Sequence, residues 1–125
     1  MKDNMVNDAA VLAFLGDSVY ALCAKIFVLE KFEGKSGVMH KEANKIICAT
    51  AQATAFDFIK ESLTEEEKDI ARRARNVNVN NVPKAAGLEN YKKATSLEAV
   101  FGWLHLRGEK ERIEELFKMA MQSLK

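Results

Sequence analysis

The chain of 125 residues has one proline, six glycines, two cysteines and two histidines. So little proline and glycine leaves little room for the many turns of a β-sandwich. Cys23 and Cys48 lie in apolar helical contexts without another Cys or His at ligand spacing, which argues against a zinc site or a disulfide framework. We expect both to be buried free thiols in a reducing cytosol. A nucleotide-binding glycine loop and a Ser/His/Asp set are also missing.

The sequence shows neither a signal peptide nor an uninterrupted membrane span. Residues 1–4 lack the basic region and cleavage site of a signal peptide. The apolar run from Ala9 to Leu29 approaches the length of a membrane span, but Asp17 and Lys25 interrupt it. The other apolar segments are amphipathic, so we expect a cytoplasmic protein that does not contact a membrane.

Apolar residues make up 48% and charged residues 30% of the chain, as in an ordinary globular protein. Helical periodicity predicts an all-α fold in a single domain over residues 1–125. Thr64 and Glu67 form a capping-box pattern at one helix start. A long segment, residues 76–93, lacks periodicity and is predicted to be a loop. The helices are expected at about 8–31, 39–59 with a break near 49–50, 64–75, 94–107 and 109–124.

An acid and a glycine interrupt the first apolar run, since Asp17 directly follows Gly16. An ionised carboxylate on a helix that is apolar all round needs a partner or a metal. If Asp17 instead lies on a narrow polar surface stripe with Ser18 and Lys25, its carboxylate needs neither a partner nor a metal. Spacing alone leaves the buried and the surface interpretation open. A glycine inside a helix costs about 1 kcal/mol against alanine. Gly16 therefore indicates that another group comes close to the backbone beside Asp17.

A second apolar run repeats this combination. Glu98 is the only acid between Ser96 and Leu106, and Gly102 lies in the same helical pattern. Two isolated carboxylates in apolar helices suggest a Mg²⁺ site, because Mg²⁺ binds through one or two carboxylates plus phosphate and water. The alternative is a structural ion pair between Glu98 and Arg75 or a lysine, and the residues leave both open.

The net charge of +1 hides an uneven distribution along the chain. Residues 72–93 carry six basic side chains and only Glu89 as an acid, a local charge of +5 that leaves −4 for the rest. Asparagines and Tyr91 interleave with them, and such side chains contact phosphate and sugar oxygens. A solvated helix end followed by a polar loop is the alternative interpretation. The combination favours a nucleic-acid backbone as partner. The basic residues are Arg72, Arg73, Arg75, Lys84, Lys92 and Lys93.

Together these motifs resemble the ribonuclease III family, and its short Mini-III branch in particular. Phe14-Leu-Gly-Asp17 is similar to the family signature, and Leu97-Glu-Ala-Val-Phe-Gly102 is similar to its second acidic motif. The similarity covers about residues 8–121. Between the two acidic motifs, segments typical of the branch follow in order: His40-Lys41, Ala51-Gln52-Ala53, Leu63 to Glu67, Arg72 to Asn76, Pro83-Lys84 and Tyr91 to Thr95.

The resemblance implies an all-helical endonuclease domain that acts as a homodimer. It implies cleavage of double-stranded RNA to 5′-phosphate and 3′-hydroxyl ends with Mg²⁺, or with Mn²⁺ in its place. Mini-III proteins lack a separate double-stranded RNA-binding domain. Their attributed role is maturation of the precursor of large-subunit (23S) ribosomal RNA, and a ribosomal protein that presents the RNA is a further expected partner.

By position, the resemblance makes Asp17 and Glu98 the catalytic and metal-binding carboxylates. Longer family members carry further acids where this chain has Ala13 and Thr95, a change that Mini-III relatives share. Against the branch pattern, Asn78 stands where a lysine is expected, which makes the loop less basic. The expected RNA-binding residues are Arg72, Arg73, Arg75, Asn76, Lys84, Tyr91, His40 and Lys41.

Two other functions compete with a Mg²⁺-dependent endonuclease for double-stranded RNA. The first is a non-catalytic dimer that binds double-stranded RNA, which would bind duplexes with or without metal and cleave none. The second is a helical dimeric scaffold whose basic loop contacts an acidic protein, which would have no affinity for duplex RNA at low salt.

Overall fold

The computed structural model describes residues 7–77 and 87–125. These residues form six α-helices and one 3₁₀-helix and contain no strand, so the predicted all-α fold is confirmed. The elements are α1 (Ala9–Lys31), α2 (Ser36–Ile47), α3 (Ala49–Ile59), η1 (Lys60–Ser62), α4 (Glu65–Arg75), α5 (Leu88–Leu106) and α6 (Lys110–Gln122).

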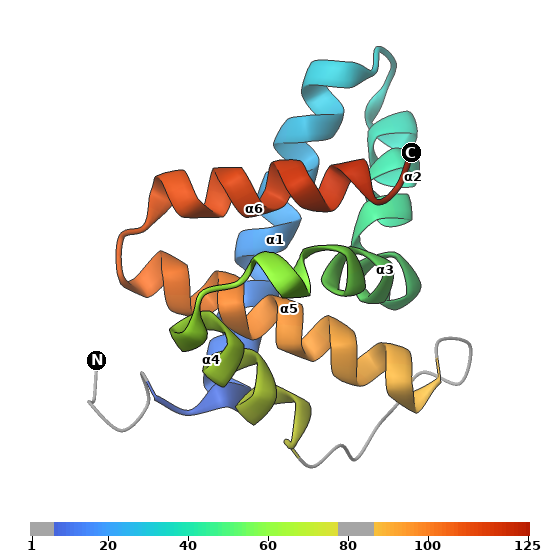
Figure 1. Cartoon of the computed structure of the whole chain (residues 1–125). Helices are drawn as coiled ribbons and strands as arrows, with labels where there is room; N and C mark the ends of the chain where they lie inside the picture. The colour runs from blue at the N-terminus through green and yellow to red at the C-terminus, as the bar shows by residue number, and fades with distance from the viewer. Residues whose placement is uncertain (1–6, 78–86) are drawn as a thin grey trace.

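Helices α1 and α5 cross in the middle of the molecule and share its most extensive interhelical contact (Figure 1). Helices α3 and α4 pack on α5, and α6 contacts α3 and α5. The side chains of Leu12, Tyr20, Leu97 and Phe101 are fully buried at this centre. The core therefore lies around the two helices that carry the isolated carboxylates.

Glycines allow the backbones of α1 and α5 to touch. A Cβ atom on Gly16 would lie 1.6 Å from the carbonyl oxygen of Glu98, and one on Gly102 would lie 2.1 Å from that of Leu12. Neither position can hold a larger residue unless the helices separate. The group that approaches the backbone beside Asp17 is thus the backbone of Glu98.

Helix α1 begins as predicted, because Asp8 Oδ1 accepts hydrogen bonds from the backbone N–H groups of Ala10 (2.9 Å) and Val11 (3.3 Å). By length and composition α1 could span a membrane, and it is the one helix in the described residues that could. Its central position accounts for that apolar character, since one side of α1 packs on α5 in the core.

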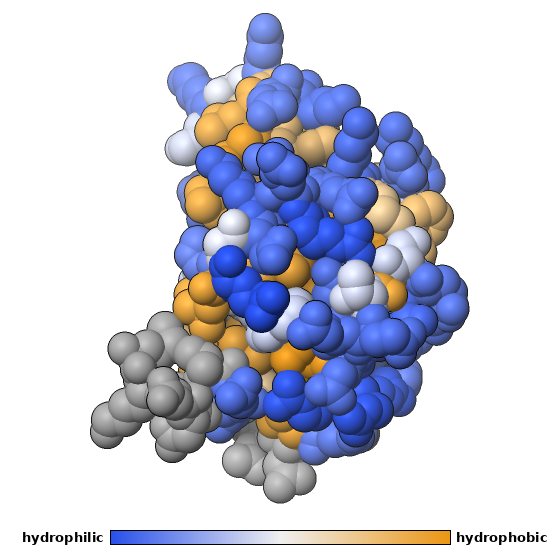
Figure 2. Space-filling view, turned by 60° about the vertical axis from the view of Figure 1, so that its left-hand side comes forward, coloured by the Kyte–Doolittle hydropathy of each residue, from blue (hydrophilic) through white to orange (hydrophobic). Residues whose placement is uncertain are grey.

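The other side of α1 leaves large apolar side chains exposed. Phe14 (81%), Leu22 (61%) and Leu29 (67%) are far more exposed than core residues, and Ile26 is half exposed. In Figure 2, hydrophobic side chains gather near the top of the view, at the height of the C-terminal part of α1 in Figure 1. Next to this face, α1 and α6 enclose a groove of about 1030 Å³ lined in part by Leu22, Phe27 and Phe117.

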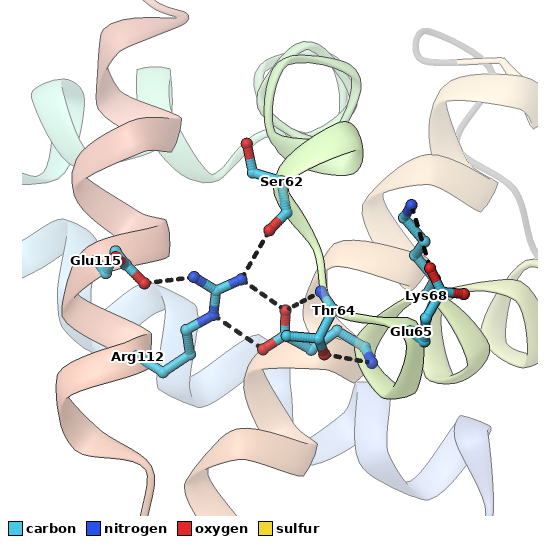
Figure 3. Close-up of polar contacts among 7 residues, drawn as sticks. Ser62, Thr64, Glu65, Lys68, Arg112 and Glu115 are labelled. Atoms are coloured by element: carbon cyan, nitrogen blue, oxygen red, sulfur yellow. Dashed lines mark hydrogen bonds and ion pairs between the residues drawn. The ribbon is translucent and has the colours of Figure 1, made fainter.

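The predicted capping box at the start of α4 is confirmed and has a further partner (Figure 3). The backbone N–H of Thr64 donates to Glu67 Oε1 (2.9 Å), and that of Glu67 donates to Thr64 Oγ1 (3.1 Å). Arg112 of α6 donates to both oxygens of Glu67, at 2.9 and 2.8 Å, and to the carbonyl of Ser62 at 2.9 Å. This network joins α6 to the turn before α4.

Two helices start earlier than predicted. Helix α2 begins at Ser36 and not near Met39, because Gly34, with φ of +148°, makes the turn while Gly37 lies inside the helix. Helix α5 begins at Leu88 and not at Ala94, so the last residues of the expected loop are helical. The predicted break falls at Cys48, between α2 and α3.

The two cysteines differ in exposure. Both are free thiols, as predicted, and Cys23 is half-buried. Cys48 is exposed, so the expectation that it is buried was wrong. Its place between α2 and α3, where the chain leaves the helical conformation, turns it out of the core.

Candidate functional site

A cavity of about 400 Å³ opens between the N-terminal halves of α1 and α5. Helix α1 contributes Asp17 to its wall, and α5 contributes Glu98, so the structure brings the two isolated carboxylates together. The remaining walls mix apolar and polar side chains from α1, α5 and the segment just after α4. These residues are Ala10, Ala13, Phe14, Val77, Tyr91 and Thr95.

The two carboxylates differ in their surroundings. Asp17 is exposed, whereas Glu98 is half-buried behind it. Burial and, to a smaller extent, the neighbouring Asp17 carboxylate raise the pKa of Glu98 to about 8, although the side-chain amide of Gln52 acts in the opposite direction. Two negative charges at this place therefore need a compensating proton or cation.

The structure shows where the alternative partners of the two carboxylates lie. Ser18 and Lys25 are exposed like Asp17, so the polar stripe on α1 exists. The expected alternative pair between Glu98 and Arg75 is wrong, because Arg75 Nη2 binds both carboxylate oxygens of Glu89, at 2.7 and 2.9 Å. Glu89 lies in the first turn of α5, which the sequence interpretation had placed in the loop.

The donor set of the cavity consists of few oxygen ligands. Within residues 7–77 and 87–125, no three His, Cys, Asp or Glu side chains converge as a metal cage. Two adjacent carboxylates with open space beside them suit Mg²⁺, which keeps several waters and also takes phosphate oxygens. Ala13 and Thr95 line the same cavity, and the Thr95 hydroxyl donates to the Tyr91 carbonyl at 2.9 Å. The residues present therefore fit a hydrated divalent ion.

The basic end of α4 is partly neutralised by neighbouring acids. Arg72 and Arg73 both pair with Asp69, Arg73 through its Nε at 3.2 Å. Arg73 Nη1 also donates to the carbonyl of Asn7 at 2.9 Å. Arg75 is held by Glu89. The local charge is thus smaller than the count over residues 72–93 suggested.

The other expected RNA-binding residues are spread over the molecule. Tyr91 lines the cavity, and Asn76 is the exposed C-cap residue of α4. His40 and Lys41 are exposed on α2, which lies well away from α4 in Figure 1, so the structure does not bring them to the cavity. Lys84 lies outside the described residues, as does Asn78.

Sequence reasoning missed the role of Gln52 beside the carboxylates. This residue was singled out only within a motif of the resemblance, yet it is 3% exposed and its amide acts to lower the pKa of Glu98. A polar residue among alanines in a helix is the one signal that could have drawn attention to it.

Residues 10–109 match the Ribonuclease III domain family. A Mini-ribonuclease 3 of a Thermoanaerobacter species is 40% identical over 112 residues, which are 90% of this chain and 79% of that protein. The Mini-ribonuclease 3 of Streptococcus pneumoniae is 37% identical over 97% of this chain and 95% of its own length. A crystal structure of a Fusobacterium nucleatum protein is similar with a TM-score of 0.85 and 28% identity, over 94% of both chains.

The all-α fold, the paired carboxylates and these matches agree, and the chain belongs to the ribonuclease III family. Membership makes it an endoribonuclease whose class of substrate is RNA. The full-length similarity to Mini-ribonuclease 3 proteins places it in that branch, as the motifs predicted.

Proposed function

We propose that this protein is a Mg²⁺-dependent endonuclease for double-stranded RNA, with Asp17 and Glu98 as the catalytic, metal-binding carboxylates and Mn²⁺ as an alternative ion. The observation that carries the proposal is the meeting of these two side chains in one open cavity. A bound Mg²⁺ would supply an activated water and neutralise charge on the leaving oxygen. The carboxylates hold and orient the ion, and the products carry 5′-phosphate and 3′-hydroxyl ends.

The RNA backbone contacts the basic end of α4. Arg72, Arg73 and Arg75 are held by exposed carboxylates, and such surface pairs are worth little, so phosphate oxygens can replace those partners. Tyr91 lies at the cavity wall, in reach of a strand whose phosphate enters the site. Recognition rests on the A-form backbone and 2′-hydroxyls more than on base identity. Asn76 and Lys84 belong to the same proposal, and His40 and Lys41 on α2 would contact the duplex away from the cavity.

The protein acts as a homodimer through the exposed apolar face of α1, formed by Phe14, Leu22, Ile26 and Leu29. Exposed clusters of large apolar side chains often mark protein–protein interfaces. The adjacent groove is lined by acidic side chains, Glu30 and Glu114, and by basic ones, Lys31 and Lys118. Two copies related by a twofold axis can pair these opposite charges.

The biological substrate is the precursor of 23S ribosomal RNA in the cytoplasm, with a ribosomal protein presenting the RNA. The similarity to Mini-ribonuclease 3 proteins supports this setting. A non-catalytic RNA-binding dimer is the competing function, and the small donor set, with Ala13 and Thr95 in place of acids, is the observation that favours it.

The test is cleavage of a structured duplex RNA with and without Mg²⁺, with the ends of the products mapped. Asp17→Asn and Glu98→Gln should each lower the cleavage rate by more than about 100-fold. Loss of a residue that only orients a metal ligand costs up to about 100-fold, so loss of a ligand itself should cost more. Asp57→Asn, an acid-to-amide change outside the cavity, should retain activity. Binding without cleavage by the wild-type protein would establish the competing function.

A further inference from the structure

Among the described residues, one ion pair links the basic end of α4 to another helix. Arg75 Nη2 donates to both carboxylate oxygens of Glu89, at 2.7 and 2.9 Å, although the two residues lie 14 positions apart in the chain. Arg72 and Arg73 instead pair with Asp69 on their own helix, at the spacing of three and four residues that any helix provides. The pair of Arg75 and Glu89 therefore depends on how α4 and α5 are arranged in the fold.

This ion pair lies at the edge of the candidate site. Val77, which lines the cavity, follows Arg75 by two residues. Tyr91, on the same cavity wall, follows Glu89 by two residues. An RNA strand with one phosphate in the cavity thus brings a neighbouring phosphate close to Arg75. A guanidinium group binds carboxylate and phosphate oxygens with similar geometry, so the Glu89 carboxylate occupies a position that suits that phosphate.

Glu89 can leave Arg75 at low cost. The side chains of Arg75 and Glu89 are 42% and 58% exposed, and ion pairs as exposed as this one contribute little stability. Glu89 also lies in the first turn of α5, where the helix dipole favours a negative charge whether or not Arg75 is near. The helix start thus explains an acid at this position, but it does not explain the bond to Arg75.

We propose that Glu89 stands in for an RNA phosphate on Arg75, is displaced when duplex RNA binds, and thereby opposes binding. The inference rests on the proposed function, in which the basic end of α4 contacts the RNA backbone. Displacement leaves an unpaired carboxylate beside the bound strand, next to a cavity that already contains Asp17 and Glu98. Arg75 therefore accepts a phosphate only where the other contacts of the duplex compensate for the lost ion pair.

The primary test is the affinity for a structured duplex RNA, measured without divalent ions so that metal-dependent cleavage does not occur. Glu89→Gln keeps the size of the side chain and removes its charge. It should bind the duplex about two- to five-fold more tightly than the wild type, the range that the strength of an exposed ion pair allows. Arg75→Ala should weaken binding. The gain from Glu89→Gln should be smaller in the Arg75→Ala background, because the competition for Arg75 is then absent.

Glu66→Gln is the matched control, since it removes the same charge from an exposed glutamate in the first turn of α4. It should bind duplex RNA like the wild type. The inference is overturned if Glu89→Gln binds no more tightly than Glu66→Gln, or if its gain is as large without Arg75 as with it. Failure of the proposed function looks different, because the wild type then has no affinity for duplex RNA.

Discussion

Glu67 keeps a charged carboxylate almost entirely inside the protein, at 2% exposure. Burial by itself would raise its pKa. Hydrogen bonds from Arg112 and from the backbone N–H of Thr64 outweigh burial and leave the pKa of Glu67 below its ordinary value of 4.5. The ionised form is therefore part of the folded structure, and its loss removes the link between α6 and the start of α4.

This lowered pKa predicts sensitivity to acid. A carboxylate with a lower pKa in the folded state contributes stability that is complete above its unfolded pKa, and this contribution is lost as the pH falls through the folded pKa. Unfolding in urea should therefore need less denaturant as the pH drops below about 4.5, and Glu67→Gln should flatten this dependence. Glu66→Gln, a change at an exposed neighbour, should keep the wild-type slope, and an equal slope for both variants would contradict the prediction.

At the scale of elements, the contact between α1 and α5 depends on glycine. Gly16→Ala places a Cβ far closer to the Glu98 carbonyl oxygen than van der Waals contact allows, so we expect a loss of at least about 1–3 kcal/mol, the usual cost of overpacking. Gly37→Ala is the matched change in α2, where nothing lies within 4 Å, and it should stabilise the protein by about 0.5–1 kcal/mol. Urea unfolding measures both changes. A Gly16→Ala midpoint equal to that of the wild type would show that the helices separate without cost.

Local chemistry made several elements predictable. Asp8 and the Thr64–Glu67 capping box act through neighbours two or three residues away, so the sequence contains the whole interaction. The start of α2 was misplaced because Gly34 and Gly37 look alike in a sequence, and only the turn conformation separates them. The identity of the group that touches Gly16 is a tertiary property, and no local pattern encodes it.

The same distinction applies to the candidate site. Two acids, each alone in an apolar helix, predicted that the carboxylates meet, and they line one cavity. Asp69 lies three residues before Arg72 and four before Arg73, so helical spacing predicts that it pairs with both. The charge count over residues 72–93 began after Asp69 and therefore missed these pairs. The pair between Arg75 and Glu89 joins two helices and could not be read from spacing.

At the scale of the whole molecule, the apolar face of α1 predicts the oligomeric state. Leu22→Asp and Leu29→Asp place charges in the proposed interface, so each should convert a dimer to a monomer. Sedimentation equilibrium at micromolar concentration measures the mass. Val38→Asp, at an exposed apolar residue of α2, should leave the dimer intact. A monomeric wild-type protein would refute the interface.

The backbone contact between Gly16 and Glu98 also limits how closely α1 and α5 can approach each other. Two helices in van der Waals contact resist further approach steeply but can separate more gradually. The separation between the α1 and α5 backbones beside Asp17 and Glu98 thus has a minimum that main-chain atoms set. Heat, strain or a new side chain at the crossing can only increase this backbone separation, so such disturbances should act in one direction, toward weaker metal binding.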